Sequence, residues 1–195
     1  EYPGNGLGDY RESAIAVETL QGNTGVMVTL ESYEILEEKP VLEGLPASFG
    51  NEGKTLVLHC RDGVLDLEVD LLYSVFEAED VITRSVRVRN GGSAPVWLTK
   101  VYSACVDMDC RDYEMVTLHG SWARERQIDV RTLGYGKQSV GSVRGETSHQ
   151  EHSFLALRER GTTQERGEVY GFQLVYSGNF LAQAEKTQMD MLRVV

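Results

Sequence analysis

Strict alternation of apolar and polar side chains is the feature that most constrains the fold of this chain. In Leu65–Leu71 every second residue is apolar, and the residues between them carry carboxylates. Ile82–Arg89 repeats the pattern and runs into the turn sequence Asn90–Pro95. Successive side chains of a β-strand point to opposite faces, so this period of two predicts half-buried strands. Val96–Val106 is the expected return strand.

Other short segments of the same kind are separated by glycine-rich breaks, and none has an apolar stripe at helical spacing. They predict further strands at Gly25–Leu36, Thr55–Cys60, Glu114–His119, Gln127–Leu133, Phe154–Arg158 and Val169–Tyr176. About ten or more strands with little helix are typical of an antiparallel sandwich or barrel. Glu1–Arg11 and Gly134–Ser153 are expected to be long loops. We expect one domain over residues 1–195, and Leu192–Val195 suggests that the chain ends inside it.

Composition narrows the classes of partner. The formal net charge of −11 argues against nucleic acid and an anionic membrane surface as partners, and no apolar stretch approaches the roughly 20 residues of a membrane span. The chain has three cysteines, and such a small, odd number does not indicate a disulfide framework. No signal peptide is visible in this sequence, which lacks a starting Met, and we expect a cytoplasmic protein.

Known catalytic and metal motifs are missing from the sequence. The pairs His149/His152 and Cys105/Cys110 match no common zinc spacing, so we expect no metal and no cofactor. A nucleophile elbow, a P-loop and a dinucleotide fingerprint are absent. Glycosidases hold two carboxylates across the scissile bond. No pair of acids here has a context that singles it out, so we expect no catalytic residue in this chain.

Two polar-aromatic clusters remain as candidates for binding. Asp9, Tyr10 and Arg11 follow the glycine-rich stretch Gly4–Gly8. A carboxylate accepts hydrogen bonds from sugar hydroxyls and an aromatic ring covers an apolar sugar face, although a loop salt bridge explains the same residues. The second cluster is Trp122–Arg126, for which we favour a strand-end ion pair of Arg124 with Trp122 packed beneath it.

Several segments together resemble the N-terminal domain of α-galactosidases of glycoside hydrolase family 36. They occur in consistent order along nearly the whole chain: Tyr2–Glu12, Gly44–Ala47, Asp80–Asn90, Leu118–Arg126, Arg144–Gln150 and Gly167–Phe180. The sequence departs from the family pattern at His152–Ser153, where similar proteins usually carry Asn-Pro.

The resemblance implies a β-supersandwich, a large twisted sandwich of antiparallel sheets, truncated here at its C-terminal end. It implies that a (β/α)8 barrel follows in the same chain and carries the catalytic pair of a retaining α-galactosidase. It also implies terminal α-galactosides as substrates, no cofactor, and a homo-oligomer. By resemblance Asp9 is a galactose ligand supported by Tyr10 and Arg11, and His149 is a weaker candidate on the substrate side.

Three alternatives stay open at this point. The first is a free-standing carbohydrate-binding module, which would bind sugar without any barrel. The second is a purely structural assembly domain, in which Asp9 has no role in activity. The third is the N-terminal domain of another supersandwich glycosidase or phosphorylase with a different sugar specificity.

Overall fold

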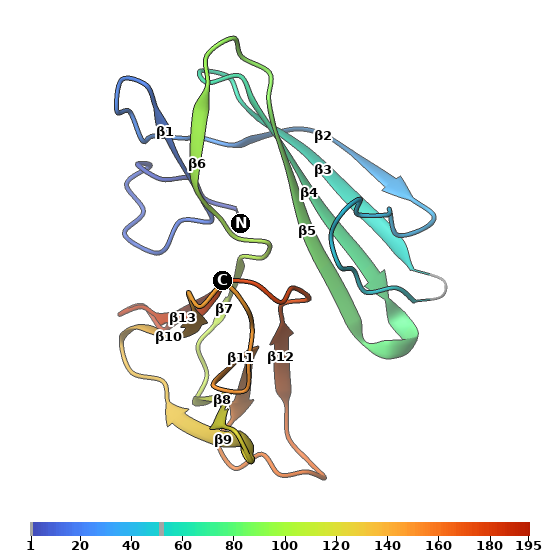
Figure 1. The fold of residues 1–195 in the computed structure, drawn as a ribbon, viewed down its shortest axis with the longest axis vertical. Helices are drawn as coiled ribbons and strands as arrows, with labels where there is room; N and C mark the ends of the chain where they lie inside the picture. Colours follow the sequence, from blue (N-terminus) through green and yellow to red (C-terminus); the bar gives the residue numbers. More distant parts are fainter. Residues whose placement is uncertain (1, 51–52) are drawn as a thin grey trace. The chain divides into compact units, whose positions relative to one another are not determined.

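The structure is a computed structural model that describes residues 2–50 and 53–195, and it is built almost entirely from antiparallel strands (Figure 1). The described residues contain fourteen strands and one short 3₁₀ helix, Glu77–Glu79. The all-β prediction is therefore confirmed. None of the described helical residues forms a segment that is long and apolar enough to cross a membrane.

The chain divides into two compact units, Glu1–Cys105 and Val106–Val195. The expected return strand Val96–Val106 is wrong as a single strand, because β6 (Val96–Val101) ends before Tyr102 and β7 (Val106–Asp109) belongs to the second unit. Each unit contains its own sheets. The expectation of one domain stays a prediction.

The first unit contains a meander of four strands and a separate pair. The meander follows chain order, with β2 (Thr29–Leu36), β3 (Lys54–Asp62), β4 (Leu67–Phe76) and β5 (Val81–Asn90). The pair joins β1 (Ile15–Thr19) to β6 across the unit. Alternation in β4 has the predicted effect, because Leu67, Val69 and Leu71 are buried while Glu68 and Asp70 are partly exposed.

Arg84 lies on the apolar face of this meander without a bulge in its strand, since β4 and β5 pair in continuous register. Its guanidinium lies 4.0 Å from the Tyr73 ring centroid and 5.6 Å from that of Tyr2. Nη1 donates to the carbonyl of Ser85 at 2.7 Å, and Nη2 is buried without a hydrogen-bond partner. Aromatic rings, rather than a buried carboxylate, thus receive this inward-facing cation.

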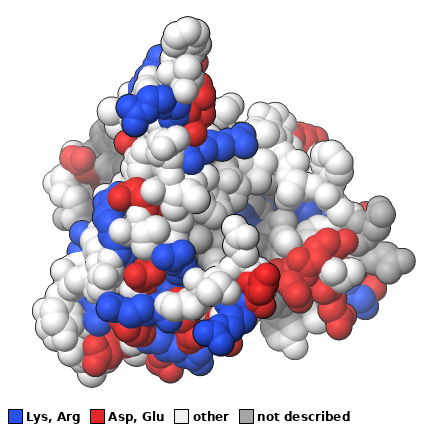
Figure 2. Space-filling model, turned by 90° about the horizontal axis from the view of Figure 1, so that it is seen from below, with Lys and Arg blue, Asp and Glu red and all other residues white. Residues whose placement is uncertain are grey.

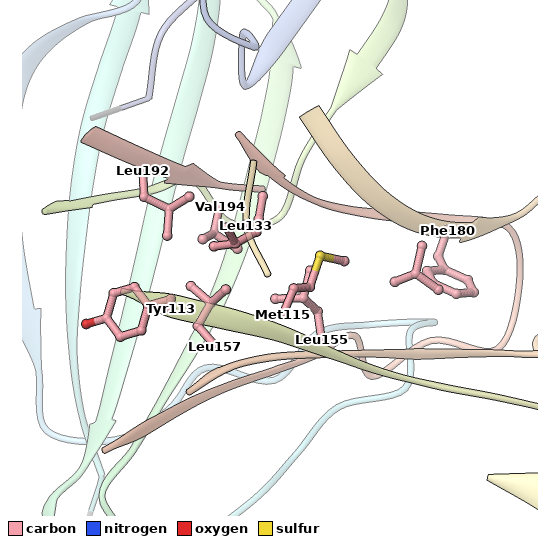
Figure 3. Packing of buried hydrophobic residues seen from close by; sticks show 10 residues of the cluster. Tyr113, Met115, Leu133, Leu155, Leu157, Phe180, Leu192 and Val194 are labelled. Carbon is pink, nitrogen blue, oxygen red and sulfur yellow. The ribbon is translucent and has the colours of Figure 1, made fainter. Parts of the chain in front are cut away.

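The second unit is a sandwich of two four-stranded sheets. One sheet has the order β12 (Val169–Gln173), β11 (Glu151–Glu159), β8 (Tyr113–Ser121), β9 (Arg124–Thr132). The other has the order β10 (Gly136–Ser142), β13 (Phe180–Lys186), β14 (Met191–Val194), β7. Figure 3 shows the core between them, to which β8 and β11 contribute Met115 and Leu155 and the other sheet contributes Leu192 and Phe180.

One charged side chain is completely buried in this unit. Arg193 in β14 has 0% side-chain exposure, and its Nε and Nη2 atoms each donate to Asp107 of β7 at 2.7 Å. A buried guanidinium is tolerated when a carboxylate binds it at two points. The pair therefore ties two neighbouring strands that lie 86 residues apart in sequence.

The expected long loop Gly134–Ser153 is wrong for half of its length. β10 occupies Gly136–Ser142, and β11 begins at Glu151, which leaves residues 143–150 between the two strands. That remaining segment contains His149.

Candidate functional site

The segment that carries Asp9 starts from a fixed base. Pro3 O accepts the Ala14 N–H at 2.8 Å, Asn5 N donates to Ile15 O, and Val26 N donates to Asn5 O, both at 3.1 Å. A Cβ on Gly4 would lie 1.8 Å from the carbonyl oxygen of Val26, so only glycine fits there. Residues 3–5 are thereby held against the start of β1, and the loop leaves from a defined point.

Glycine conformations turn this loop outward. Gly6 and Gly8 have φ of 82° and 81°, values that other residues rarely adopt. Residues 6–10 are exposed, and Tyr10 is 65% exposed. The predicted aromatic residue is thus presented to solvent at the end of the glycine-rich stretch.

Asp9 and Arg11 form a compact, locally closed pair within the loop. Asp9 Oδ1 accepts the backbone N–H of Arg11 at 2.9 Å and its Nε–H at 3.0 Å, while Oδ2 accepts from Nη2 at 2.8 Å. The backbone contact spans two residues, as in an Asx turn. Arg11 consequently fixes the orientation of the carboxylate.

Two further groups support the loop from β6 and its continuation. Lys100 of β6 forms an ion pair with Glu12, and its Nζ lies 5.7 Å from the Tyr102 ring centroid. Burial, followed by the negative charge of Glu12, raises the pKa of Tyr102 to about 12. Tyr2 donates its hydroxyl to Tyr102 O at 2.7 Å, and burial raises the pKa of Tyr2 as well. Both phenols therefore stay neutral around the base of the loop.

His149, the fourth predicted residue, lies in the second unit, in the segment 143–150. This segment is fastened by the hydrogen bond from Gly145 N to Asn179 Oδ1 at 2.6 Å and by that from Thr147 N to Ser177 O at 2.8 Å. Arg144 Nη1 donates to Gln150 Oε1 at 2.7 Å. Asp9, Tyr10 and Arg11 thus share one loop of the first unit, and His149 occupies a fastened loop of the second.

Among the described residues, no three His, Cys, Asp or Glu side chains converge in a way that could hold a metal ion. His152 is only partly exposed, and its Nε2 atom is buried without a hydrogen-bond partner. Since a zinc site needs three or four converging ligands, the His149/His152 pair lacks a ligand set within the part of the chain that the structure describes.

Sequence reasoning missed Glu12 and Lys100 as supports of the loop. Glu12 directly follows Arg11, so its position was a usable signal. Lys100 lies 88 residues away in sequence, and nothing local marks it as the partner of Glu12.

The chain belongs to the family described as glycosyl hydrolase family 36 N-terminal domain, whose profile it matches over residues 1–195. It is 41% identical over its whole length to the probable α-galactosidase G of Aspergillus terreus and to the α-galactosidase AgaA of Geobacillus stearothermophilus. It covers only 27% of each of these relatives. The chain thus corresponds to about a quarter of their length.

Solved structures agree with this assignment. AgaA variants from Geobacillus stearothermophilus in complex with raffinose and with stachyose match 99% of this chain with a TM-score of 0.96 and 41% identity. The chain covers 27% of each of those proteins. At this identity and score, both the fold and the family relationship are established.

Proposed function

We propose that this chain is the N-terminal domain of a retaining α-galactosidase that hydrolyses terminal α-galactosides such as melibiose and raffinose-type oligosaccharides. The relatives are α-galactosidases, and two of the similar structures hold raffinose and stachyose. The relatives extend well beyond the matched quarter, which supports a catalytic barrel that follows in the same chain. The domain itself contributes substrate contacts and subunit packing.

The observation that carries the substrate role is the fixed orientation of Asp9 on an exposed loop. Its carboxylate accepts donors from Arg11, and a carboxylate accepts equally well from a sugar hydroxyl. A hydroxyl of galactose would take the place of one of the Arg11 donors, and Tyr10 would lie beside the ring. Because Arg11 already holds the carboxylate in a fixed orientation, little ordering is required on binding.

A purely structural role is the second candidate, and the same ion pair favours it. Asp9 and Arg11 are two residues apart and partly exposed, so they could serve only to shape the loop. Exposed pairs of this kind contribute little to stability. The two candidates therefore differ in what loss of the carboxylate does to turnover.

The decisive experiment replaces Asp9 in the full-length enzyme. Asp9→Ala is expected to lower kcat/KM for α-galactosides by about ten- to a hundredfold, because a charged hydrogen bond to a hydroxyl contributes roughly 1.5–3 kcal/mol. Glu37→Ala is the matched control, since Glu37 is an exposed acid that forms an ion pair with Lys54 at the surface. Equal kcat/KM for wild type and Asp9→Ala would leave the structural role.

The remaining parts of the proposal have their own tests. The isolated chain should not hydrolyse a chromogenic α-galactoside, because it has no recognisable carboxylate pair.

His149→Ala in the full-length enzyme should raise KM if the 143–150 segment reaches substrate. A homo-oligomer should appear by analytical ultracentrifugation of the full-length enzyme, and a monomer would refute that part.

A further inference from the structure

The tip of the β8–β9 hairpin has an unusual construction. Ser121 pairs with Arg124, which leaves Trp122 and Ala123 at the turn. His119 pairs with Gln127, so Glu125 and Arg126 together stand opposite the single residue Gly120. Two residues opposite one define a β-bulge, which redirects the side chains of the bulged strand.

Several contacts hold this tip in a defined shape. Ala123 and Arg126 have φ of 61° and 55°, a left-handed conformation that side chains other than glycine seldom adopt. Ala123 N donates to Glu125 Oε1 at 2.7 Å, and backbone hydrogen bonds lower the pKa of Glu125. A Cβ on Gly120 would lie 2.5 Å from Arg124 O, so the bulge requires glycine there. Strained backbone that persists in this way is a hallmark of functional sites.

The side chains at the tip are available for a ligand. Trp122 is 85% exposed, and both Arg124 and Arg126 are exposed without a carboxylate partner among the described residues. The expected strand-end ion pair over a packed Trp122 is therefore wrong. Trp97 provides a contrast, because it is 53% exposed within β6 and pairs with Glu18 of β1, away from any hairpin tip.

The hairpin lies directly beside the segment that contains His149. Gly120 N donates to Gln150 O at 3.3 Å, and a Cβ on Gly120 would lie 3.0 Å from His149 O. Gln150 is itself held by Arg144. An exposed indole thus stands at the end of a strand pair that contacts, through Gly120, a polar loop with amide, hydroxyl and imidazole groups.

From this arrangement we propose that Trp122 is the stacking platform of a second saccharide subsite, distinct from the Asp9 loop. The indole would cover the apolar face of one sugar ring of an oligosaccharide, and Arg124 or Arg126 would donate hydrogen bonds to its hydroxyls. The choice of an oligosaccharide rests on the proposed function; the stacking geometry does not.

Other ligand classes fit less well. In the view of Figure 2, basic and acidic side chains are interspersed, and a polyanion would need a continuous basic surface. Exposed Trp and Arg residues also occur at the centres of protein interfaces. A protein contact at Trp122 would give a fluorescence shift that follows protein concentration, whereas a saccharide subsite gives one that follows sugar concentration.

The test uses the intrinsic fluorescence of this chain. Trp97→Phe leaves Trp122 as the sole indole, since the chain contains two Trp residues. Stachyose should cause a saturable blue shift of its emission and remove about half or more of its quenching by acrylamide, because the ring is covered. Sorbitol at the same concentration should do neither. The complementary variant Trp122→Ala, which retains Trp97, should not respond to stachyose.

Each outcome decides the proposal. No saturable response in the Trp97→Phe chain, with its β-rich far-ultraviolet spectrum intact, would overturn it. A shift that follows protein concentration and not sugar would replace it with a protein contact. In a Trp97→Phe background, Asp9→Ala should leave the response unchanged. A failed Asp9 test in the full-length enzyme together with an intact Trp122 response would refute the galactose contact and keep this subsite.

Discussion

The guanidinium of Arg84 stacks on the ring of Tyr73 in the neighbouring strand, 4.0 Å from its centroid, while its Nη2 atom is buried without an acceptor. The two residues face each other directly in the β4–β5 register. Burial lowers the pKa of Arg84, and the nearby phenols of Tyr73 and Tyr2 oppose that shift. The ring contact therefore compensates in part for an incomplete hydrogen-bond set.

We predict that Tyr73→Leu destabilises the chain more than Arg84→Met does. Loss of the ring leaves a buried cation with less compensation, whereas Arg84→Met removes the cation and its unpaired Nη2 together. A double-mutant cycle from urea denaturation should give a coupling of about 1–2 kcal/mol. Tyr33→Leu, an exposed tyrosine on the same sheet, is the control. Strict additivity of Tyr73→Leu and Arg84→Met would contradict the prediction.

The sequence predicted the strands whose alternation faces a core. Leu67, Val69 and Leu71 are buried as expected because the meander has one covered face. The missed strands lack such a pattern. In β10 only Val140 is buried, so the apolar and polar side chains of this strand do not alternate. Backbone pairing with β13 holds the strand in place. β1 is short, and its partner β6 lies about 80 residues later in the chain, where no local signal reveals it.

Local contacts of the candidate site could be expected from the sequence, whereas contacts between distant residues could not. Gly8 and Asp9 predict an exposed turn that carries a carboxylate, and Asp9 finds its partner Arg11 only two residues further along the chain. Trp122 was misjudged because an indole next to arginines suggests packing, and only the bulge opposite Gly120 turns the tip into solvent.

Gly8→Ala should strain the Asp9 loop. Apart from its chain neighbours, none of the described residues lies within 4 Å of a Cβ on Gly8, so the reason is its φ of 81° and not a clash. A left-handed conformation costs an alanine roughly 1–2 kcal/mol, which the exposed loop can avoid by rearranging. We expect little change in stability and a fall in kcat/KM of the full-length enzyme. Gly25→Ala, an exposed glycine with open space and no positive φ, should change neither.

His59 should make the stability depend on pH. The hydrogen bond from its ring to Asp70 at 2.8 Å is the largest cause of its raised pKa. A raised pKa in the folded state stabilises below the unfolded pKa, and the gain disappears as the pH rises through the folded value. The stability difference between wild type and His59→Gln should therefore be largest below the ordinary histidine pKa of about 6.5 and should shrink as the pH rises through the raised pKa of the folded state.

Asp70→Asn provides the control for that titration, because it removes the main hydrogen-bond acceptor of the ring. In an Asp70→Asn background the His59→Gln substitution should lose most of its pH dependence in urea denaturation. An unchanged slope would mean that Glu34, 3.5 Å from Nε2, dominates instead.

Asp107→Ala should be severely destabilising. It would remove the carboxylate that binds the fully buried guanidinium of Arg193 at two points, a change that typically costs about 3–5 kcal/mol. The double change Asp107→Leu with Arg193→Met should recover much of that loss. Glu68→Gln, which breaks the exposed pair with Arg89, should have little effect. A mild Asp107→Ala variant by thermal denaturation would contradict this account.

The placement of β14 between β13 and β7 sets an order of events during synthesis. All strand pairings of the first unit lie within residues 1–105, so that unit can acquire its structure while the ribosome is still translating the second. β7 has to wait, because its neighbour β14 is made about 80 residues later. Until then the apolar side chains that form the core of the second unit stay exposed, so a chaperone would bind this half of the nascent chain.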